Sequence, residues 1–200
     1  MKKIIFNDRY GLTQAVIDGR KTMTRRIEFD KEFQKMIDDS DSYYYDDGYL
    51  VFATQDVDIH HVKTRYKVGE VVAVAQRYQD IFDYSNCVNP YDWEDDDKPS
   101  GWTNKMFTEA KLMPHRIRIT GIKCERLQDI SDADCLKEGV YSDYADTEFP
   151  PREFYDYGGN TDNGFDTPRE AFASLIDKVS GCGTWASNPW VVAYEFELVK

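Results

Sequence analysis

The chain has 200 residues, enough for one domain that buries roughly 70% of its unfolded surface without disulfide or metal support. Charged residues make up 31% of the sequence, and no apolar run approaches the ~20 residues that a membrane span requires. Residues 1–8 carry two lysines with no long apolar stretch behind them, unlike a signal peptide. We therefore expect a cytoplasmic protein with no membrane partner.

The formal net charge of −12 argues against a nucleic-acid partner, because a protein that binds nucleic acid tightly has to neutralise phosphates. The basic residues, however, gather in two segments. Residues 1–27 hold seven basic and two acidic residues, and residues 105–126 hold six basic and two acidic residues. A local basic surface on an acidic protein is therefore compatible with the sequence.

The first half of the chain predicts short strands and short helices. These are a strand at 3–6, a helix at 9–18, an extended segment at 22–27, a helix near 31–37, and strands at 49–52 and 71–75. Gly19 follows the first helix, as is usual at a helix C-terminus. Residues 79–104 are acidic but rich in aromatic side chains, which disordered segments lack, so we expect an insertion that packs on the domain.

The second half contains the clearest strand. Apolar and polar residues alternate over 115–125, with a slip of one position near Gly121 that predicts a β-bulge. The other expected elements are a helix over 131–137 capped by Ser131 and ended by Gly139, a polar loop over 141–165, a helix over 168–179 opened by a capping box at Thr167 and Glu170, and a central apolar strand over 190–198.

Strands outnumber helices in this prediction, and long irregular connections separate them. The pattern is typical of an α+β protein that is mainly β. We expect a small, partly open β-barrel with two or three flanking helices and long inserted loops, formed by residues 1–200 as a single domain.

The cysteines and histidines do not predict a metal site. The cysteines are 37, 11 and 47 residues apart, and none of the three histidines has ligand spacing to them; they are Cys87, Cys124, Cys135 and Cys182. We interpret the cysteines as buried or idle thiols, and we expect neither a metal nor a cofactor.

The densest group of chemically active side chains is the segment 19–26, Gly-Arg-Lys-Thr-Met-Thr-Arg-Arg. In an extended chain Thr22, Thr24 and Arg26 share one face. Crowding of cations penalises each positive charge, so Lys21 is driven toward its neutral, reactive form. A solvated basic turn after a helix is the alternative interpretation of the same residues.

Four segments, in this order along the chain, resemble the ASCH-domain proteins (activating signal cointegrator homology), a branch of the PUA-like superfamily. They are residues 15–26, residues 66–72 (Tyr-Lys-Val-Gly-Glu-Val-Val), residues 116–130 (from Arg-Ile-Arg-Ile-Thr to Arg-Leu-Gln-Asp-Ile) and residues 188–196 (Asn-Pro-Trp-Val-Val-Ala-Tyr-Glu-Phe). The longer, phage- and prophage-associated members are the most similar. The resemblance then implies insertions at about 28–65, 78–113 and 140–187.

The resemblance also implies a cleft between barrel and helices, lined by the Gly-Arg-Lys-Thr segment. Members of the superfamily bind RNA or DNA, or act on modified nucleosides. One small bacterial branch hydrolyses N(4)-acetylcytidine to cytidine and acetate with a lysine, a threonine and a glutamate. By motif these residues fall on Lys21, Thr24 and Glu138, and Arg26 matches a further cleft arginine. The implied function is nucleic-acid or nucleoside binding, with an amidohydrolase activity as its chemical extension.

Several further side chains are expected to contact the substrate: Arg20, Thr22, Arg25, Arg26, Gln76, Arg116 and Arg118. Gln76 stands where many longer relatives have a glutamate, and a glutamine cannot act as a carboxylate base. Arg116 and Arg118 alternate out of their predicted strand and meet either phosphates or solvent. The expected partner is RNA, DNA or a free nucleoside or nucleotide.

A function of another class is also compatible with the sequence. The acidic, aromatic inserts would bind a partner protein, and the cleft would be vestigial. Their aromatic residues, Tyr43-Tyr44-Tyr45, Trp93 and Trp102, either stack on bases or pack the inserts against the barrel.

Overall fold

A five-stranded mixed sheet forms the centre of the protein. The structure, a computed structural model, describes residues 1–38, 40–54, 59–82, 98–145, 152–158 and 164–199. The strands follow the order β1 (Lys3–Ile4), β6 (Val71–Val74), β7 (Arg116–Arg126), β10 (Trp190–Val199) and β2 (Met23–Arg26). The β1–β6 pair is parallel and the other pairs are antiparallel. The fold is thus α+β with more strand than helix, as predicted.

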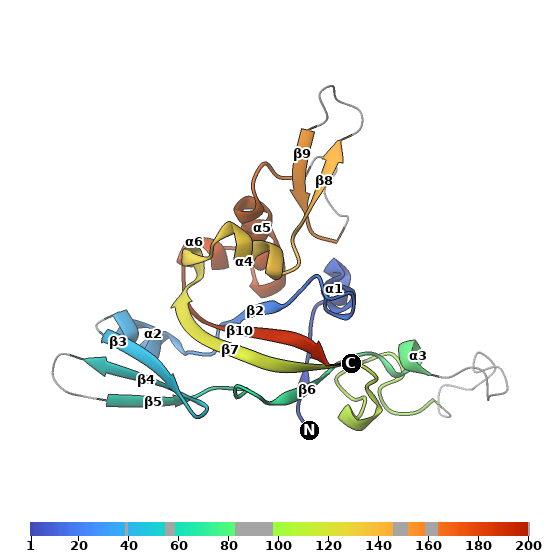
Figure 1. The fold of residues 1–200 in the computed structure, drawn as a ribbon, viewed down its shortest axis with the longest axis horizontal. Coiled ribbons are helices and arrows are strands. Elements are labelled where there is room, and N and C mark those ends of the chain that lie inside the picture. The colour runs from blue at the N-terminus through green and yellow to red at the C-terminus, as the bar shows by residue number, and fades with distance from the viewer. Residues whose placement is uncertain (39, 55–58, 83–97, 146–151, 159–163, 200) are drawn as a thin grey trace.

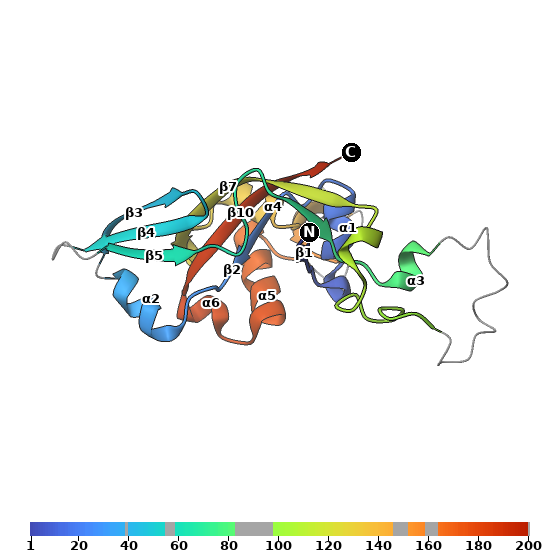
Figure 2. The same cartoon turned by 90° about the horizontal axis from the view of Figure 1, so that it is seen from below.

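The described strands of the main sheet form an open, curved sheet (Figure 1) with β1 and β2 at its two edges (Figure 2), and they do not close into a barrel. Both edge strands are short, two and four residues. A side chain spans the gap between them: Arg26 Nη2, from β2, donates to the carbonyl of Ile5, just after β1, at 2.8 Å. Where a closed barrel would have backbone hydrogen bonds, this protein has a space lined by side chains.

The long strands β7 and β10 carry most of the pairing, and both were predicted. In β7 the side chains of Ile117 and Ile119 are buried while those of Arg116 and Arg118 are exposed. Glu195 pairs with Gly121, but the next residue, Phe196, pairs with Ile119, so one residue of β7 bulges out of register. The bulge confirms the predicted slip near Gly121 and accounts for a local bend in the sheet.

Helices cover one side of this sheet (Figures 1 and 2). They are α4 (Asp132–Lys137), α5 (Pro168–Ser180) and α6 (Thr184–Ser187), with α1 (Leu12–Ile17) beside the N-terminal strand. The caps predicted for two of them are present: the Ser131 side chain accepts from the Asp134 amide, and the Thr167 side chain accepts from the Glu170 amide. These caps fix where α4 and α5 begin, and α4 leads directly to Glu138.

The first insertion forms a subdomain-like layer at one end of the long strands (Figure 1). It contains α2 (Lys31–Asp38) and an antiparallel sheet of β3 (Ser40–Asp46), β4 (Tyr49–Thr54) and β5 (Ile59–Lys63). The helix and β4 were predicted. Strands β3 and β5 were not, because their sequences are mostly polar and they form by pairing with β4. Phe29, Phe33 and Phe52 pack together beneath this sheet.

The second insertion contains α3 (Tyr78–Ile81), and its described part packs on the domain as expected. Trp102 contacts the rings of Tyr78 and Phe82. Lys3 Nζ donates to three carbonyls of the insertion, those of Lys105, Met106 and Thr108. The expectations for Cys87 and Trp93 lie outside the described residues.

The third insertion corrects the sequence analysis. Where a polar loop was predicted, β8 (Tyr141–Ala145) and β9 (Arg152–Asp156) pair as an antiparallel hairpin that projects away from the main sheet (Figure 1). The prediction was wrong because most of these residues are polar, so the apolar alternation that marks a strand is absent. Tyr157, which follows β9 and is fully buried, anchors the hairpin to the core.

The described cysteines agree with their interpretation as thiols. Cys124 and Cys135 are buried and free, and burial raises the pKa of each to about 12; Cys182 is free and exposed. Within the described residues no three histidine, cysteine or acidic side chains form a possible metal site. No helix in the described ranges is long and apolar enough to cross a bilayer.

Candidate functional site

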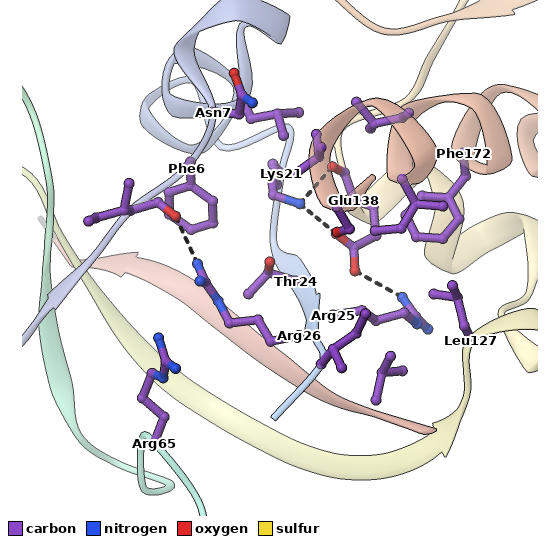
Figure 3. A pocket seen from close by; sticks show the side chains of 18 residues that line it. Phe6, Asn7, Lys21, Thr24, Arg25, Arg26, Arg65, Leu127, Glu138 and Phe172 are labelled. Atoms are coloured by element: carbon purple, nitrogen blue, oxygen red, sulfur yellow. Dashed lines mark hydrogen bonds and ion pairs between the residues drawn. The ribbon is translucent and has the colours of Figure 1, made fainter. Parts of the chain in front are cut away.

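A pocket of about 370 Å³ opens in the gap between the sheet edges, under α5 (Figure 3). Its polar wall is supplied by β2, the segment before it, the end of α4 and two connections: Asn7, Lys21, Thr24, Arg25, Arg26, Arg65 and Glu138. Its apolar wall includes Phe6 from the N-terminal segment, Leu127, and the face of α5 that carries Phe172 and Ile176. Both the volume and the mixed lining are typical of a small-molecule site.

A buried ion pair lies in this wall. Lys21 Nζ is 2.6 Å from Glu138 Oε2 and 2.7 Å from the Glu138 carbonyl oxygen, and both side chains are nearly inaccessible to solvent. The lysine is placed by the turn after α1, where its amide donates to the Ala15 carbonyl. The glutamate is placed by the C-terminus of α4, which ends at Gly139 with a φ of +104°. The sequence places these two residues 117 positions apart, and the fold joins them.

Burial lowers the pKa of Lys21 below its ordinary value of 10.5. The negative charge of Glu138 opposes this shift, while the charges of Arg26 and Arg25 add to it. The lowering of the Lys21 pKa agrees in direction with the sequence analysis. Its largest cause, however, is the desolvation of the buried ammonium group and not the charge of the neighbouring cations. Lys21 therefore releases its proton more readily than an exposed lysine does.

Arg25 holds the other side of Glu138. Its guanidinium is fully buried and contacts three carboxylates: Glu138 Oε1 at 3.1 Å, Asp134 Oδ2 at 3.0 Å and Glu125 Oε1 at 2.6 Å. Each oxygen of the Glu138 carboxylate thus has its own cation, Lys21 on one and Arg25 on the other. Arg25 was predicted to contact the substrate, but these carboxylates occupy its donors, and we assign it instead the positioning of Glu138.

Thr24 and Arg26 both line the pocket, as their predicted shared face requires (Figure 3). Thr24 is buried beside the Lys21–Glu138 pair. Arg26 lies about 6.0 Å from the centre of the Phe6 ring, and its Nε atom is buried without a hydrogen-bond partner in the described part of the chain. A hydroxyl and a partly satisfied guanidinium are therefore available to a ligand.

The other predicted substrate contacts lie outside this pocket. Thr22 is tied into the fold by its backbone, whose amide donates to Lys137 and whose carbonyl accepts from Phe196. Arg20 lines a separate, shallow depression with Tyr141, over whose ring it lies at 5.9 Å. Gln76 lies beyond the end of β6, and Arg116 and Arg118 are exposed on β7; none of these three is among the residues that line the pocket.

Sequence reasoning missed Phe6, Arg65 and the lining face of α5. Phe6 had been assigned to the first strand, where an aromatic residue signals core. Arg65 directly precedes the Tyr66-Lys67 turn, and that adjacency to a family-like segment was the one available signal. The amphipathic helix α5 was predicted, but its sequence does not tell which cavity its apolar face covers.

No known protein family, curated protein or solved structure matches this chain. The resemblance to ASCH proteins therefore stays a prediction. The functional inference has to rest on the chemistry of the pocket.

Proposed function

We propose that the pocket binds the base of a pyrimidine nucleoside, free or within RNA, and hydrolyses an N-acyl group such as that of N(4)-acetylcytidine. One observation carries the proposal: a buried lysine with a lowered pKa is paired with a carboxylate beside a threonine hydroxyl, at the wall of a pocket of base-compatible size. Perturbed lysines in pockets are typical of sites that transfer protons.

The lining suits a flat, polar-edged ring. Phe6 and Phe172 offer aromatic surface, while the polar groups lie mainly on the β2 wall (Figure 3). Thr24 and Arg26 supply hydrogen bonds to the edge of a base. The combination of apolar faces and a few convergent polar groups is how proteins bind such ligands.

The proposed chemistry adds water across the amide. Neutral Lys21 has two N–H groups, which donate to the carboxylate and the carbonyl of Glu138, so its lone pair is free to accept a proton. A water gives up that proton and attacks the acyl carbon. If the Thr24 hydroxyl attacks instead, it forms an acyl ester and releases the base amine, and a water then hydrolyses this ester in a second step assisted by Lys21. Arg26 stabilises the oxyanion that forms. When the C–N bond breaks, Lys21 returns the proton to the departing base amine, leaving carboxylic acid and free amine.

The proposal includes the ASCH assignment, of the longer phage-associated type with a PUA-like barrel. Two features support it: the Gly-Arg-Lys-Thr segment enters an edge strand, and the pocket lies between that strand and the helices. RNA or a nucleoside is the partner that this assignment favours.

Hydrolysis of N(4)-acetylcytidine by the purified protein, followed by chromatography, tests the proposal. Lys21→Met and Thr24→Val should abolish or strongly reduce turnover, and Lys111→Met, which alters an exposed lysine outside the pocket, should not. Thermal melts of each variant separate lost chemistry from lost fold. Turnover that survives Lys21→Met in a folded protein would contradict the proposal, as would its absence in the wild type.

The alternative of a protein-interaction module has less support. Three described aromatic residues of the second insertion, Tyr78, Phe82 and Trp102, contact one another, while a fourth, Phe107, is exposed. Trimming this insertion would also disturb the pocket, because Lys105 Nζ donates to the carbonyl of Phe6. A pull-down whose partners survive Lys21→Ala but are lost on trimming residues 80–102 would favour the alternative.

A further inference from the structure

Two guanidinium groups, those of Arg26 and Arg65, line the pocket on the side away from Glu138 (Figure 3). Arg26 comes from β2, and Arg65 comes from the connection between β5 and β6. Arg65 has 57% of its side chain exposed, so it lies at the mouth rather than in the wall. Ile5 and Ile27, also partly exposed, complete this rim.

The charges at this end of the pocket are not balanced. Lys21 is matched by Glu138, and Arg25 is matched by its three carboxylates. Among the described residues Arg26 has no carboxylate partner; it donates to the Ile5 carbonyl and leaves its buried Nε unpaired. Arg65 has one carboxylate, Glu28, at 3.4 Å. Among the described residues, these two guanidiniums therefore have one carboxylate contact between them, that of Arg65 with Glu28. This local excess of positive charge lies in a chain whose formal net charge is −12.

Arg65 is held in place by its backbone while its side chain stays accessible. Its amide donates to the hydroxyl of Tyr194 at 3.1 Å, and that hydroxyl donates to Glu28 Oε2 at 2.7 Å. Its carbonyl accepts from Lys2 Nζ at 2.6 Å. Tyr194 is fully buried, so the position of Arg65 is anchored to the core. The guanidinium is bound only by its long contact to Glu28 among the interactions described here, and can exchange it for a ligand.

We propose that the ligand of this pocket carries a phosphate group, and that Arg65 binds this phosphate at the mouth, with the positive charge of Arg26 nearby, while the base lies against Lys21, Thr24 and Glu138. The inference rests on the proposed function and narrows it: the ligand class is a nucleoside phosphate, not a neutral nucleoside. Guanidinium matches phosphate because its planar N–H groups pair with two oxygens at once, and because it is weakly hydrated.

Calorimetric titration with cytidine, cytidine 5′-monophosphate and a short single-stranded RNA containing cytidine tests this inference. The wild type should bind the monophosphate at least tenfold more tightly than cytidine. Arg65→Gln should weaken binding of the monophosphate much more than binding of cytidine and so remove most of that difference, and Arg65→Lys should retain part of it. Arg152→Gln is the control, since Arg152 is similarly exposed, also contacts a carboxylate, that of Asp166 at 3.6 Å, and does not line the pocket.

The outcomes separate this inference from the proposed function. Equal binding of cytidine and its monophosphate, or an Arg65→Gln variant that weakens both alike, would overturn the phosphate site and leave the base pocket standing. Binding of none of the three ligands would overturn both. If the RNA binds more tightly than the monophosphate with the same dependence on Arg65, the phosphate belongs to a polymer. If the two bind equally, it belongs to a free nucleotide.

Discussion

Replacing Glu138 by glutamine removes the negative charge between two buried cations while keeping the shape of the side chain. Lys21 and Arg25 are 2% and 0% exposed, so neither can recover its hydration in the variant. Loss of one partner from a buried ion pair typically costs about 3–5 kcal/mol. Arg25 keeps Glu125 and Asp134, and Lys21 can release its proton, so we expect the lower end, about 3 kcal/mol. With an m-value near 2 kcal/mol/M, the urea midpoint should fall by about 1.5 M.

Urea unfolding at pH 7 of the wild type, Lys21→Met, Glu138→Gln and the double variant gives the coupling energy directly. Because the double variant lacks both charges, its loss of stability should be about 2 kcal/mol smaller than the sum of the single losses. The same cycle on the exposed pair Arg118–Glu197, 3.3 Å apart, should give under about 1 kcal/mol. A Lys21–Glu138 coupling as small as that of the exposed pair would refute our description of the buried cluster.

Three further predictions test how the cluster and its supports are built. Folding lowers the pKa of Lys21, so the unfolded chain binds this proton more tightly than the folded protein does. The free energy of unfolding of the wild type, relative to that of Lys21→Met, should therefore rise with pH between the lowered pKa and 10.5. If this relative stability did not change with pH, the lowered pKa of Lys21 would be contradicted. Gly158→Ala should destabilise the protein by well over 1 kcal/mol, because a Cβ there would lie 2.8 Å from the Tyr10 backbone. Gly19 has a similar φ (+76° against +69°) but open space around it, so Gly19→Ala should cost only about 1 kcal/mol. Equal losses of stability in thermal melts would show that the close approach to Tyr10 does not matter. Ser131→Ala should cost about 1 kcal/mol by removing the cap of α4, which chemical denaturation would detect, and no change would mean that packing alone fixes that helix.

The elements that sequence reasoning predicted are those in which local pattern and tertiary role agree. The alternation in β7 is visible in the sequence because one face, with Ile117 and Ile119, is buried and the other is exposed. The caps Ser131 and Thr167 act within one helical turn, so three or four residues suffice to predict them. No long-range information is needed for either feature.

The elements that were missed depend on partners far along the chain. Strand β3 has the sequence Ser-Asp-Ser-Tyr-Tyr-Tyr-Asp, which carries no buried stripe and forms because β4 lies beside it. How far the main sheet opens was likewise not predictable, since it depends on how far β1 and β2 diverge. An arginine side chain rather than a backbone ladder spans that gap.

Several residues that line the pocket could be predicted from the sequence, but the role of each residue could not. Lys21, Thr24, Arg26 and Glu138 line one pocket, while their roles remain predictions. Arg25 differs from Arg26 only in which side of β2 its guanidinium reaches, and that depends on carboxylates about 100 positions away. Arg65 had only its adjacency to the Tyr66-Lys67 turn as a signal, because its position depends on Tyr194 and Glu28, which hold its backbone.

The position of β2 has a consequence for how the protein folds. This strand lies at the sheet edge and pairs with β10. Met23 therefore gains its partner in the sheet only when Glu195, far along the chain, is present. Closing so long a loop is slow, and it follows the formation of local structure. In a growing chain the segment that carries Lys21 is thus made early, but the pocket wall is complete only when residues 190–199 have paired with it. The chemistry of the site is in this way made conditional on a finished fold.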